Sequence, residues 1–499
     1  MGSNKSGWLL YIPILVLGAY LLIRLIDQSK IMWFFPLDTT NDMSSYMAQF
    51  YFLLKCGYHN LCPYWYNGFI AFELTPPGWY FFALPIYWLT KDIQVTFYIS
   101  LIVIYVLAFL GIFLIGRLLK FSILQRLLFF LLFFGNAIAI GNFIRLGRVP
   151  ELFAWLNFLI IGLAVLYYKD KPIGLSFFWL IPPLSIVILS HQTVAILAGI
   201  MIMSLFFIKH SAERIKIALC ALLPLGLTSF WWLPYLKSFG GSAGVGLVLT
   251  ETLLRFDRAY IAQTLAAFII PVILWLVFYM YWKSNNRPLK DLVFFSLPLL
   301  LSLLFFTRLI ILIPLLKYIY PDVYMLYFLF FALFLFLKTD FSLFGKRIIL
   351  LAHIMLILFA VASVAVNALH TPGFITPGES VQEVLSLLGR VNGTFLLIGA
   401  TPSTLYANAV YSYAPIYHGL FTSGGWYTTL ITPEYYNHLV SINNYLDEAD
   451  CGSLISTANF LNTSYLITLN NYCSTLGACG LSYIDKNSNA CLYGVKQNV

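Results

Sequence analysis

The sequence predicts a polytopic α-helical membrane protein that ends in a small extracytoplasmic α/β domain. Of its 499 residues, 61% are hydrophobic and only 10% are charged, whereas a soluble domain has about 25% charged residues. Long apolar runs recur along most of the chain, with lengths near the roughly 20 residues that cross a bilayer as a helix. From residue 368 onward, polar residues and cysteines become frequent and shorter segments replace the apolar runs.

Eleven apolar runs are long enough to be expected as membrane spans. The apolar segment 76–90 is shorter and contains Pro76, Pro77 and Pro85, so we expect a re-entrant or interfacial helix there. The first run lacks a small-residue cleavage site and is expected to stay as a span. The eleven expected spans are 8–26, 93–116, 121–140, 149–168, 173–189, 191–208, 216–236, 259–282, 291–307, 321–337 and 347–367.

The distribution of Lys and Arg predicts the orientation of these spans. Basic residues gather in alternate loops, which the positive-inside rule assigns to the cytoplasm. We therefore expect a multi-pass cell-membrane protein with a cytoplasmic N-terminus, and the net charge of +9 indicates no nucleic-acid partner. The basic loops are 117–126, 169–171, 209–216, 283–290 and 338–347; the loops expected outside are 27–78, 141–150, 190–191, 237–258, 308–320 and the tail.

Two domains are expected from this topology. Residues 1–367 would form the transmembrane domain, in which the first external loop, 27–78, carries interfacial helices. Residues 368–499 would form the external α/β domain, which is long enough for a core of its own. Its expected strands are 394–400, 464–469, 481–485 and 490–495, and its expected helices are 379–389, 433–446 and 451–461.

Six of the seven cysteines fall in segments that this topology places outside. An even number of external cysteines predicts disulfides in an oxidising compartment. Cys56 and Cys62 are close enough in sequence to close a turn, whereas Cys451, Cys473, Cys479 and Cys491 allow three pairings. Two further external sites, Asn392 and Asn462, begin N-x-S/T sequons and are candidates for glycosylation.

Several motifs along the chain together resemble a known superfamily. They are NDMSSYMAQF, YWYNGF and LTPPGWYFFALP in the first external loop, then LGRVPELFAW, LSHQTVAIL and FWWLPYL, and in the tail HGLFTSGGWYTTLITPEYY and FLNTSYLITL. In this order they resemble the C-type glycosyltransferases (GT-C). More closely, they resemble archaeal and bacterial membrane proteins called 6-pyruvoyl-tetrahydropterin synthase-related, and YfhO-like proteins. The resemblance covers most of the chain.

The resemblance implies a membrane glycosyltransferase that uses a polyprenyl-phosphate-linked sugar and an acid in the first external loop. That acid corresponds to Asp42, with Asp38 as the other candidate, and the acceptor would be a glycan, a lipid or a protein. The two acids are four residues apart rather than in a DxD pattern, so a need for Mg or Mn is left open.

Inverting glycosyl transfer needs a base for the acceptor hydroxyl and positive charge for the leaving phosphate. We therefore expect Asp42 or Asp38 as base and Arg145 and Arg148 as phosphate ligands. The remaining substrate-binding candidates are His191, Glu73 and Glu151.

Each of these residues also has a purely structural interpretation. Asp42 is suited to capping a helix, and arginines near an apolar segment commonly extend to the interface. His191 and Glu73 would then be a structural histidine and a solvated loop acid. Glu151 would complement a helix N-terminus or pair with Arg148.

Two other functions compete with sugar transfer. A transporter or flippase for lipid-linked intermediates would favour charges deep within several spans and two related halves, and the sequence has neither. A non-catalytic scaffold for cell-envelope assembly, with the external domain binding a partner, stays open.

Overall fold

The computed structural model describes residues 7–37, 41–241, 261–371, 373–399, 407–469 and 472–495. The chain forms two compact units. The first takes in the described residues within Met1–Gln28, Ser100–Ser229 and Leu247–Gly373, and the second those within Ser29–Ile99, Phe230–Gly246 and Phe374–Val499. The chain passes from the first unit to the second for the last time after Gly373, near the domain boundary expected at residue 367. The first external loop was expected in the transmembrane domain, but it belongs to the second unit.

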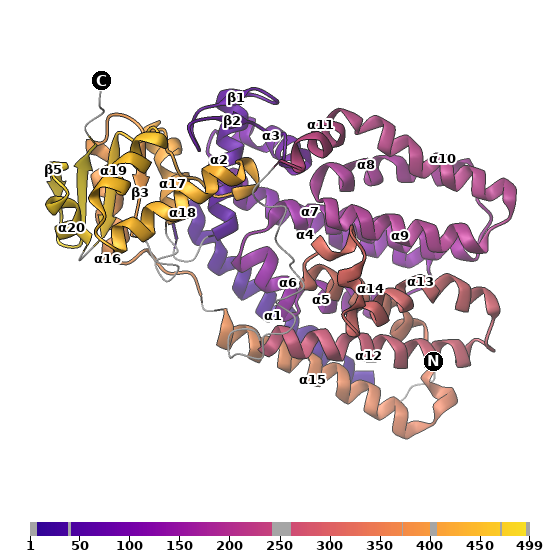
Figure 1. The fold of residues 1–499 in the computed structure, drawn as a ribbon. Coiled ribbons are helices and arrows are strands. Elements are labelled where there is room, and N and C mark those ends of the chain that lie inside the picture. The colour runs from indigo at the N-terminus through magenta and orange to yellow at the C-terminus, as the bar shows by residue number, and fades with distance from the viewer. Residues whose placement is uncertain are drawn as a thin grey trace. The chain divides into compact units, whose positions relative to one another are not determined.

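The first unit is helical (Figure 1). Helices α7 and α14 form its core, because 94% and 89% of the residues in their most apolar stretches are buried, against 17% in α15. Both α8 and α9 pack against α7. The α-helices are α1 (Tyr11–Gln28), α4 (Ile93–Leu118, mostly in this unit), α5 (Ile123–Phe134), α6 (Ala137–Ala139), α7 (Val149–Lys169), α8 (Ile181–Ser190), α9 (Gln192–Ile208), α10 (Ser211–Leu227), α12 (Ile261–Ser284), α13 (Leu289–Phe306), α14 (Pro321–Lys338) and α15 (Lys346–His370).

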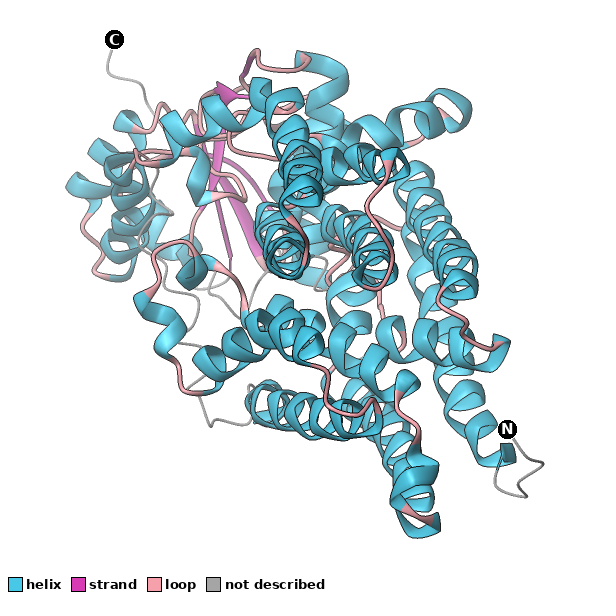
Figure 2. Ribbon diagram, turned by 90° about the vertical axis from the view of Figure 1, so that its right-hand side faces the viewer, coloured by secondary structure: helices cyan, strands magenta, loops and turns pink. Residues whose placement is uncertain are grey.

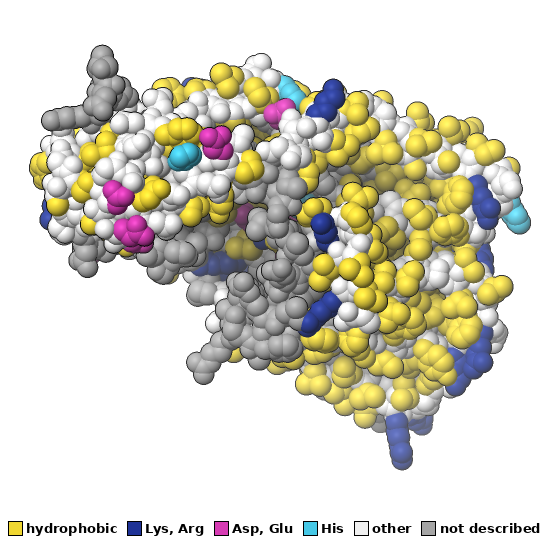
Figure 3. All heavy atoms as spheres, viewed as in Figure 1, with side chains coloured by type: hydrophobic (Ala, Val, Ile, Leu, Met, Phe, Trp, Pro, Cys, Tyr) yellow, Lys and Arg dark blue, Asp and Glu magenta, His cyan; other side chains and the backbone are white. Residues whose placement is uncertain are grey.

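Among the described residues, seven helices are long and apolar enough to cross a membrane, and nine if each of two bent pairs counts as one span. The expected spans 121–140 and 216–236 are these pairs, with bends of 50° and 71°. The shorter helices Leu175–Ser190 and Gln192–Ile208 match two further expected spans, so the count of eleven stays a prediction. In Figure 3, hydrophobic side chains cover most of the visible face of the first unit.

Loops expected on the same side of the membrane contact one another. The Lys290 ammonium pairs with Asp170 at 3.2 Å, and Lys216 donates to the carbonyl of Ile173 at 3.0 Å. At the other ends of the helices, Arg148 lies over the Tyr320 ring, 5.5 Å from its centre. The alternation of loops therefore agrees with the predicted topology, whereas the choice of cytoplasmic side stays a prediction.

The second unit contains all the described strands, which Figure 2 shows together in one region. Its main sheet has the order β3-β4-β6-β5, in which β3 and β4 are parallel and the other pairs are antiparallel. The four expected strands and three expected helices of the tail are confirmed. The elements are α2 (Asn41–Cys56), β1 (Leu61–Cys62), β2 (Phe69–Ile70), α3 (Gly78–Thr90), α11 (Ser229–Phe239, mostly in this unit), α16 (Glu379–Leu387), β3 (Phe395–Leu397), α17 (Ala407–Tyr413), α18 (Pro433–Asp447), α19 (Cys451–Phe460), β4 (Tyr465–Leu469), α20 (Tyr472–Ala478), β5 (Ser482–Lys486) and β6 (Ala490–Gly494).

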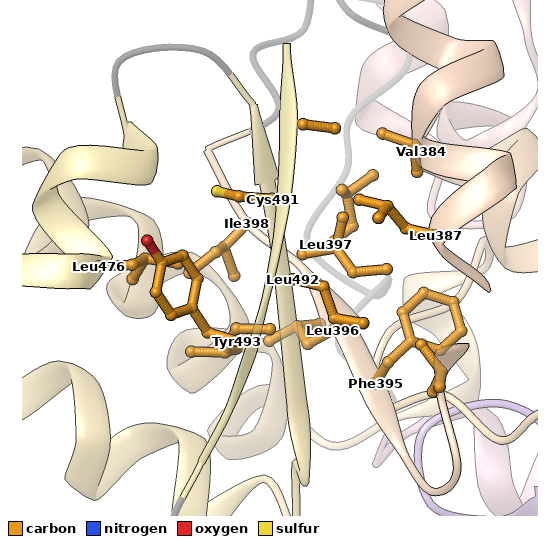
Figure 4. Packing of buried hydrophobic residues seen from close by; sticks show 14 of the residues in the cluster. Val384, Leu387, Phe395, Leu396, Leu397, Ile398, Leu476, Cys491, Leu492 and Tyr493 are labelled. Carbon is orange, nitrogen blue, oxygen red and sulfur yellow. The ribbon is translucent and has the colours of Figure 1, made fainter. Parts of the chain in front are cut away.

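Apolar side chains fill both faces of this sheet. Figure 4 shows Tyr493 on the side of Leu476 from α20, and Leu397 on the side of Val384 and Leu387 from α16. These residues are buried, as the alternation of side chains along a strand requires for a sheet covered on two faces.

Three disulfides stabilise the second unit. They join Cys56 to Cys62, Cys451 to Cys479, and Cys473 to Cys491. The predicted disulfides are thus present, and the structure selects one of the three pairings that the sequence left open for the tail. The sequon residues Asn392 and Asn462 are both exposed, and their glycosylation stays a prediction.

The first external loop and the tail are joined within the second unit. The Trp65 indole donates to the carbonyl of Tyr411 at 2.8 Å, and the Asn67 amide donates to the carbonyl of Leu461 at 2.6 Å. The backbone N–H of Thr422 donates to the carbonyl of Tyr64 at 3.0 Å. The WYNG motif therefore packs against the external domain.

Candidate functional site

A break in a helix positions the arginines of the first unit. Asn136 ends α5 and starts α6, since its side-chain amide donates to the carbonyl of Phe133 at 2.6 Å and its oxygen accepts from the N–H groups of Ile138 and Ala139. The π-helix η3 (Ile140–Arg145) follows, and Arg145 is its last residue. The chain thus bends at Asn136, about one helical turn before the end of the span expected at 121–140.

The turn after η3 presents Arg148 at the start of α7. Gly147 has φ of +69°, a conformation that favours glycine, and the N–H of Arg148 donates to the carbonyl of Asn142 at 3.0 Å. Pro150 lies in the first turn of α7, where its missing N–H costs nothing. Arg145 is 5% exposed, while the Arg148 side chain retains 20% exposure.

Arg148 is held by two acids that begin the two core helices. Its guanidinium lies 3.0 Å from a carboxylate oxygen of Asp322 and 3.7 Å from one of Glu151. The Asn142 amide donates to the same Asp322 oxygen at 2.6 Å. Both acids follow a proline at a helix start, at Pro321 in α14 and Pro150 in α7, where a negative charge is favourable.

Glu151 therefore has a structural role in the first unit. It is buried, and the Trp155 indole donates to it at 3.2 Å. Its pairing with Arg148 is the structural interpretation that the sequence allowed, and its predicted role in binding substrate is untested.

His191 lies near the Arg148–Asp322 pair. It follows α8, and its Nδ1 lies 2.9 Å from the hydroxyl of Thr193. Burial and the positive charge of Arg148 lower its pKa to about 4, against the opposing effect of Asp322. Although part of its surface is accessible, the imidazole lies deep enough to be desolvated and is therefore neutral near pH 7.

The acidic candidates of the first external loop belong to the second unit. Asp42 is half-buried in the first turn of α2, and the Ser45 hydroxyl donates to its backbone carbonyl at 3.1 Å. The same hydroxyl donates to that of Tyr427, from the tail, at 3.0 Å. Glu73 accepts a hydrogen bond from the Ser238 hydroxyl at 2.6 Å. Asp38 lies outside the described residues.

The structure brings together Arg148, Glu151 and His191 in the first unit, and it adds Asp322 and Asn142, which the sequence analysis missed. The signal for Asp322 was present, because Pro321–Asp322 repeats the Pro–acid start of Pro150–Glu151. Within the described ranges, no three His, Cys, Asp or Glu side chains cluster as metal ligands would.

Known structures share this fold. The arabinofuranosyltransferase AftD from Mycobacteria superposes with a TM-score of 0.58 at 13% identity, over 100% of this chain and 40% of that protein. The oligosaccharyltransferase of Archaeoglobus fulgidus superposes in its apo form with a TM-score of 0.55 at 11% identity, over 94% of this chain and 70% of that protein. The same enzyme with Zn and sulfate gives 0.52 at 13% identity, over 90% and 68%.

The chain therefore shares its fold with the arabinofuranosyltransferase and the oligosaccharyltransferase. No protein-family model matches the sequence, and no curated protein matches it. At these identities, the likeness establishes the fold, and this chain spans less than half the length of the mycobacterial enzyme.

Proposed function

We propose that this protein is an inverting membrane glycosyltransferase that moves a sugar from a polyprenyl-phosphate-linked donor to an extracytoplasmic glycan, lipid or protein. A closer kinship with the 6-pyruvoyl-tetrahydropterin synthase-related and YfhO-like proteins is part of the proposal. The observation that carries it is the ion-paired Arg148 at the start of α7, in a chain whose fold is shared with glycosyltransferases. Ionisable groups at such a depth are expensive and are usually functional.

The proposed donor site is built on Arg148 and Arg145. A guanidinium offers two parallel N–H donors to a phosphate, and Asp322 and Glu151 would balance its charge when no donor is bound. Neutral His191 would add a hydrogen bond without adding charge. This assignment explains why a charged group is held at a helix start by partners from α7 and α14.

The proposed base is Asp42, with Asp38 as the other candidate. The carboxylate would take the proton of the acceptor hydroxyl while the acceptor oxygen forms a bond to the anomeric carbon. The bond between that carbon and the donor phosphate oxygen breaks, and polyprenyl phosphate leaves with the negative charge that the arginines stabilise. Because an acid in the first turn of a helix also complements the helix N-terminus, the transfer rate of Asp42→Asn decides between the two roles.

Metal dependence is a separate part of the proposal. The archaeal oligosaccharyltransferase has been solved with Zn and sulfate, and Mg or Mn would suit carboxylate ligands in this chain. Transfer measured before and after treatment with EDTA, and again after Mg or Mn is restored, decides whether a metal is required.

Sugar transfer from a defined donor tests the proposal. Purified full-length protein in lipid nanodiscs would be given polyprenyl-phosphate-linked sugars together with an envelope extract that contains acceptors. We expect the release of polyprenyl phosphate to match the sugar incorporated. A panel of donors that yields neither product, with protein shown to be folded, would overturn the proposal. Donor moved between leaflets without being cleaved would instead support a flippase.

A further inference from the structure

A hollow of about 410 Å³ lies in the first unit at the end of α7 remote from Arg148. It opens to the surface and is lined by the last residues of α7, the end of α12 and the start of α13. Its walls carry Lys169, Asp170, Lys290 and Asp291, and its rim includes Asn286 of the α12–α13 turn. None of these residues takes part in the proposed transfer reaction.

The charges of the hollow are arranged in two layers. Lys169 is buried and pairs with buried Asp291 and with Asp170, the latter at 3.1 Å. At the mouth, Lys290 lies 3.2 Å from Asp170, and their side chains are 43% and 63% exposed. The inner pair is therefore fixed, while the outer pair can exchange partners with a ligand.

The charged lining of the hollow is balanced, but the segment around the α12–α13 turn beside its mouth exposes Lys283, Arg287 and Lys290. Burial lowers the pKa of Lys209 nearby, and Lys290 lowers it further, against the opposing effects of Glu213 and Asp170. Figure 3 shows basic side chains gathered along the margin of the first unit where, in the same view, α12 meets α13. A bound anion would be attracted to these exposed cations.

Apolar surface leads away from the hollow along both adjoining helices. Exposed apolar residues on α12 recur at intervals of three and four and so form one continuous stripe, whereas those on α13 form one group near each end of the helix. Trp282, on the last turns of α12, is of the type that marks the membrane interface. The stripe consists of Leu265, Ile269, Val272, Leu276 and Tyr279 on α12, and the two groups on α13 include Leu289 with Leu292 and Leu300 with Leu303.

We infer that this hollow binds the phosphate headgroup of an anionic phospholipid from the adjacent leaflet. Lys290 would contact the phosphate, Asn286 would donate hydrogen bonds to the headgroup, and the acyl chains would lie along the stripe of α12 and against Leu289 and Leu292 of α13. The site is separate from the proposed donor site, because the two lie at opposite ends of α7. Its existence does not depend on the transfer reaction.

Two substitutions of opposite expected effect test this inference. Binding of dioctanoyl phosphatidylglycerol to the detergent-solubilised full-length protein would be titrated by native mass spectrometry. Lys290→Gln should raise its dissociation constant about fivefold, in keeping with the cost of one lysine near a membrane surface. Asp170→Asn should lower it, because the substitution removes the anion that competes with the phosphate. Lys346→Gln, which removes an exposed lysine outside the hollow, serves as the matched control.

The opposite signs separate a binding site from damage to the fold. If both Lys290→Gln and Asp170→Asn weaken binding, or if Lys290→Gln has no more effect than Lys346→Gln, the inference is wrong. Inorganic phosphate that binds as tightly as the lipid would also overturn it in favour of a site for a soluble anion. Dioctanoyl phosphatidylcholine should bind more weakly than the anionic lipid.

Discussion

The guanidinium of Arg148 lies 3.0 Å from the carboxylate of Asp322 and so joins the start of α7 to the start of α14. These two helices are the most deeply buried of the candidate membrane spans. The pair therefore holds the core of the first unit together at the end where the donor phosphate is proposed to bind.

Removing both members of this pair should cost less than the sum of the costs of removing each alone. Asp322→Asn leaves a guanidinium without its main counter-charge in a poorly solvated site, and we expect a loss of about 3 kcal/mol in the free energy of unfolding. The double variant with Arg148→Gln should lose less than the sum of the two single variants, by about 1 kcal/mol or more. Denaturation of the four proteins in mixed micelles measures this coupling.

The ion pair between Arg390 and Asp485 serves as a control for that cycle. Its side chains are 72% and 39% exposed and lie 3.5 Å apart. We expect a coupling of about 0.5 kcal/mol or less there. Equal coupling energies for the two pairs would show that Arg148–Asp322 does not organise the core.

The first unit should lose stability in mild acid because of His191. Its pKa is lowered from 6.5 to about 4 in the folded protein, so the unfolded chain binds a proton between these values that the folded protein does not. The stability that the folded protein gains by keeping His191 neutral is fully present above pH 6.5 and is lost as the pH falls through 4. The midpoint of thermal unfolding should fall over this range, by an amount equivalent to about 2 kcal/mol.

The substitution His191→Gln isolates that effect. It should flatten the pH dependence of the thermal midpoint between pH 6.5 and 4. The dependence at lower pH, which comes from carboxylates, should stay. A variant whose thermal midpoint falls as steeply as that of the wild type would assign the pH dependence to other groups.

Close packing between α7 and α14 depends on Gly162. A Cβ atom built at this position would lie 2.6 Å from the ring of buried Phe330. Gly162→Ala should therefore destabilise the protein by about 1–3 kcal/mol, since the ring has no space to retreat. Gly199→Ala, in α9, is the matched control, because nothing lies within 4 Å of its Cβ position. If the two variants have equal thermal midpoints, these helices do not pack as described.

Six of the seven cysteines should resist alkylation until they are reduced. The three disulfides leave Cys220 as the free thiol among the seven. Mass spectrometry of denatured, unreduced protein should detect one alkyl group, and reduced protein should carry seven. Two or more groups before reduction would contradict the pairing, and with it the oxidising compartment expected for the second unit.

Local patterns predicted most of the secondary structure. Apolar runs marked the helices, and period-two segments marked the strands β3 to β6, because both follow from the burial of a continuous face. The even number of external cysteines indicated disulfides. The pairing in the tail depends on how α19, α20 and β6 pack, which no sequence spacing decides.

The sequence predicted only part of the cluster around Arg148. Arg148 and Glu151 are neighbours in sequence, so their pairing was anticipated. Asp322 lies on α14, far along the chain, and its approach to Arg148 results from the packing of the two core helices. The bend at Asn136 was missed because hydropathy continues across it, although Gly135 and Asn136 are residues that commonly interrupt helices.

The rate of sugar transfer by Asp42→Asn tests the central claim most directly. Wild type, Asp42→Asn, Asp38→Asn and the double variant would be compared in the nanodisc assay, with Asp92→Asn as a control in the same unit. The loss of a general base should lower the rate by about 10²–10⁴-fold in one single variant and in the double variant, while Asp92→Asn stays near the wild-type rate. Sugar transfer at the wild-type rate by the folded double variant would contradict the account.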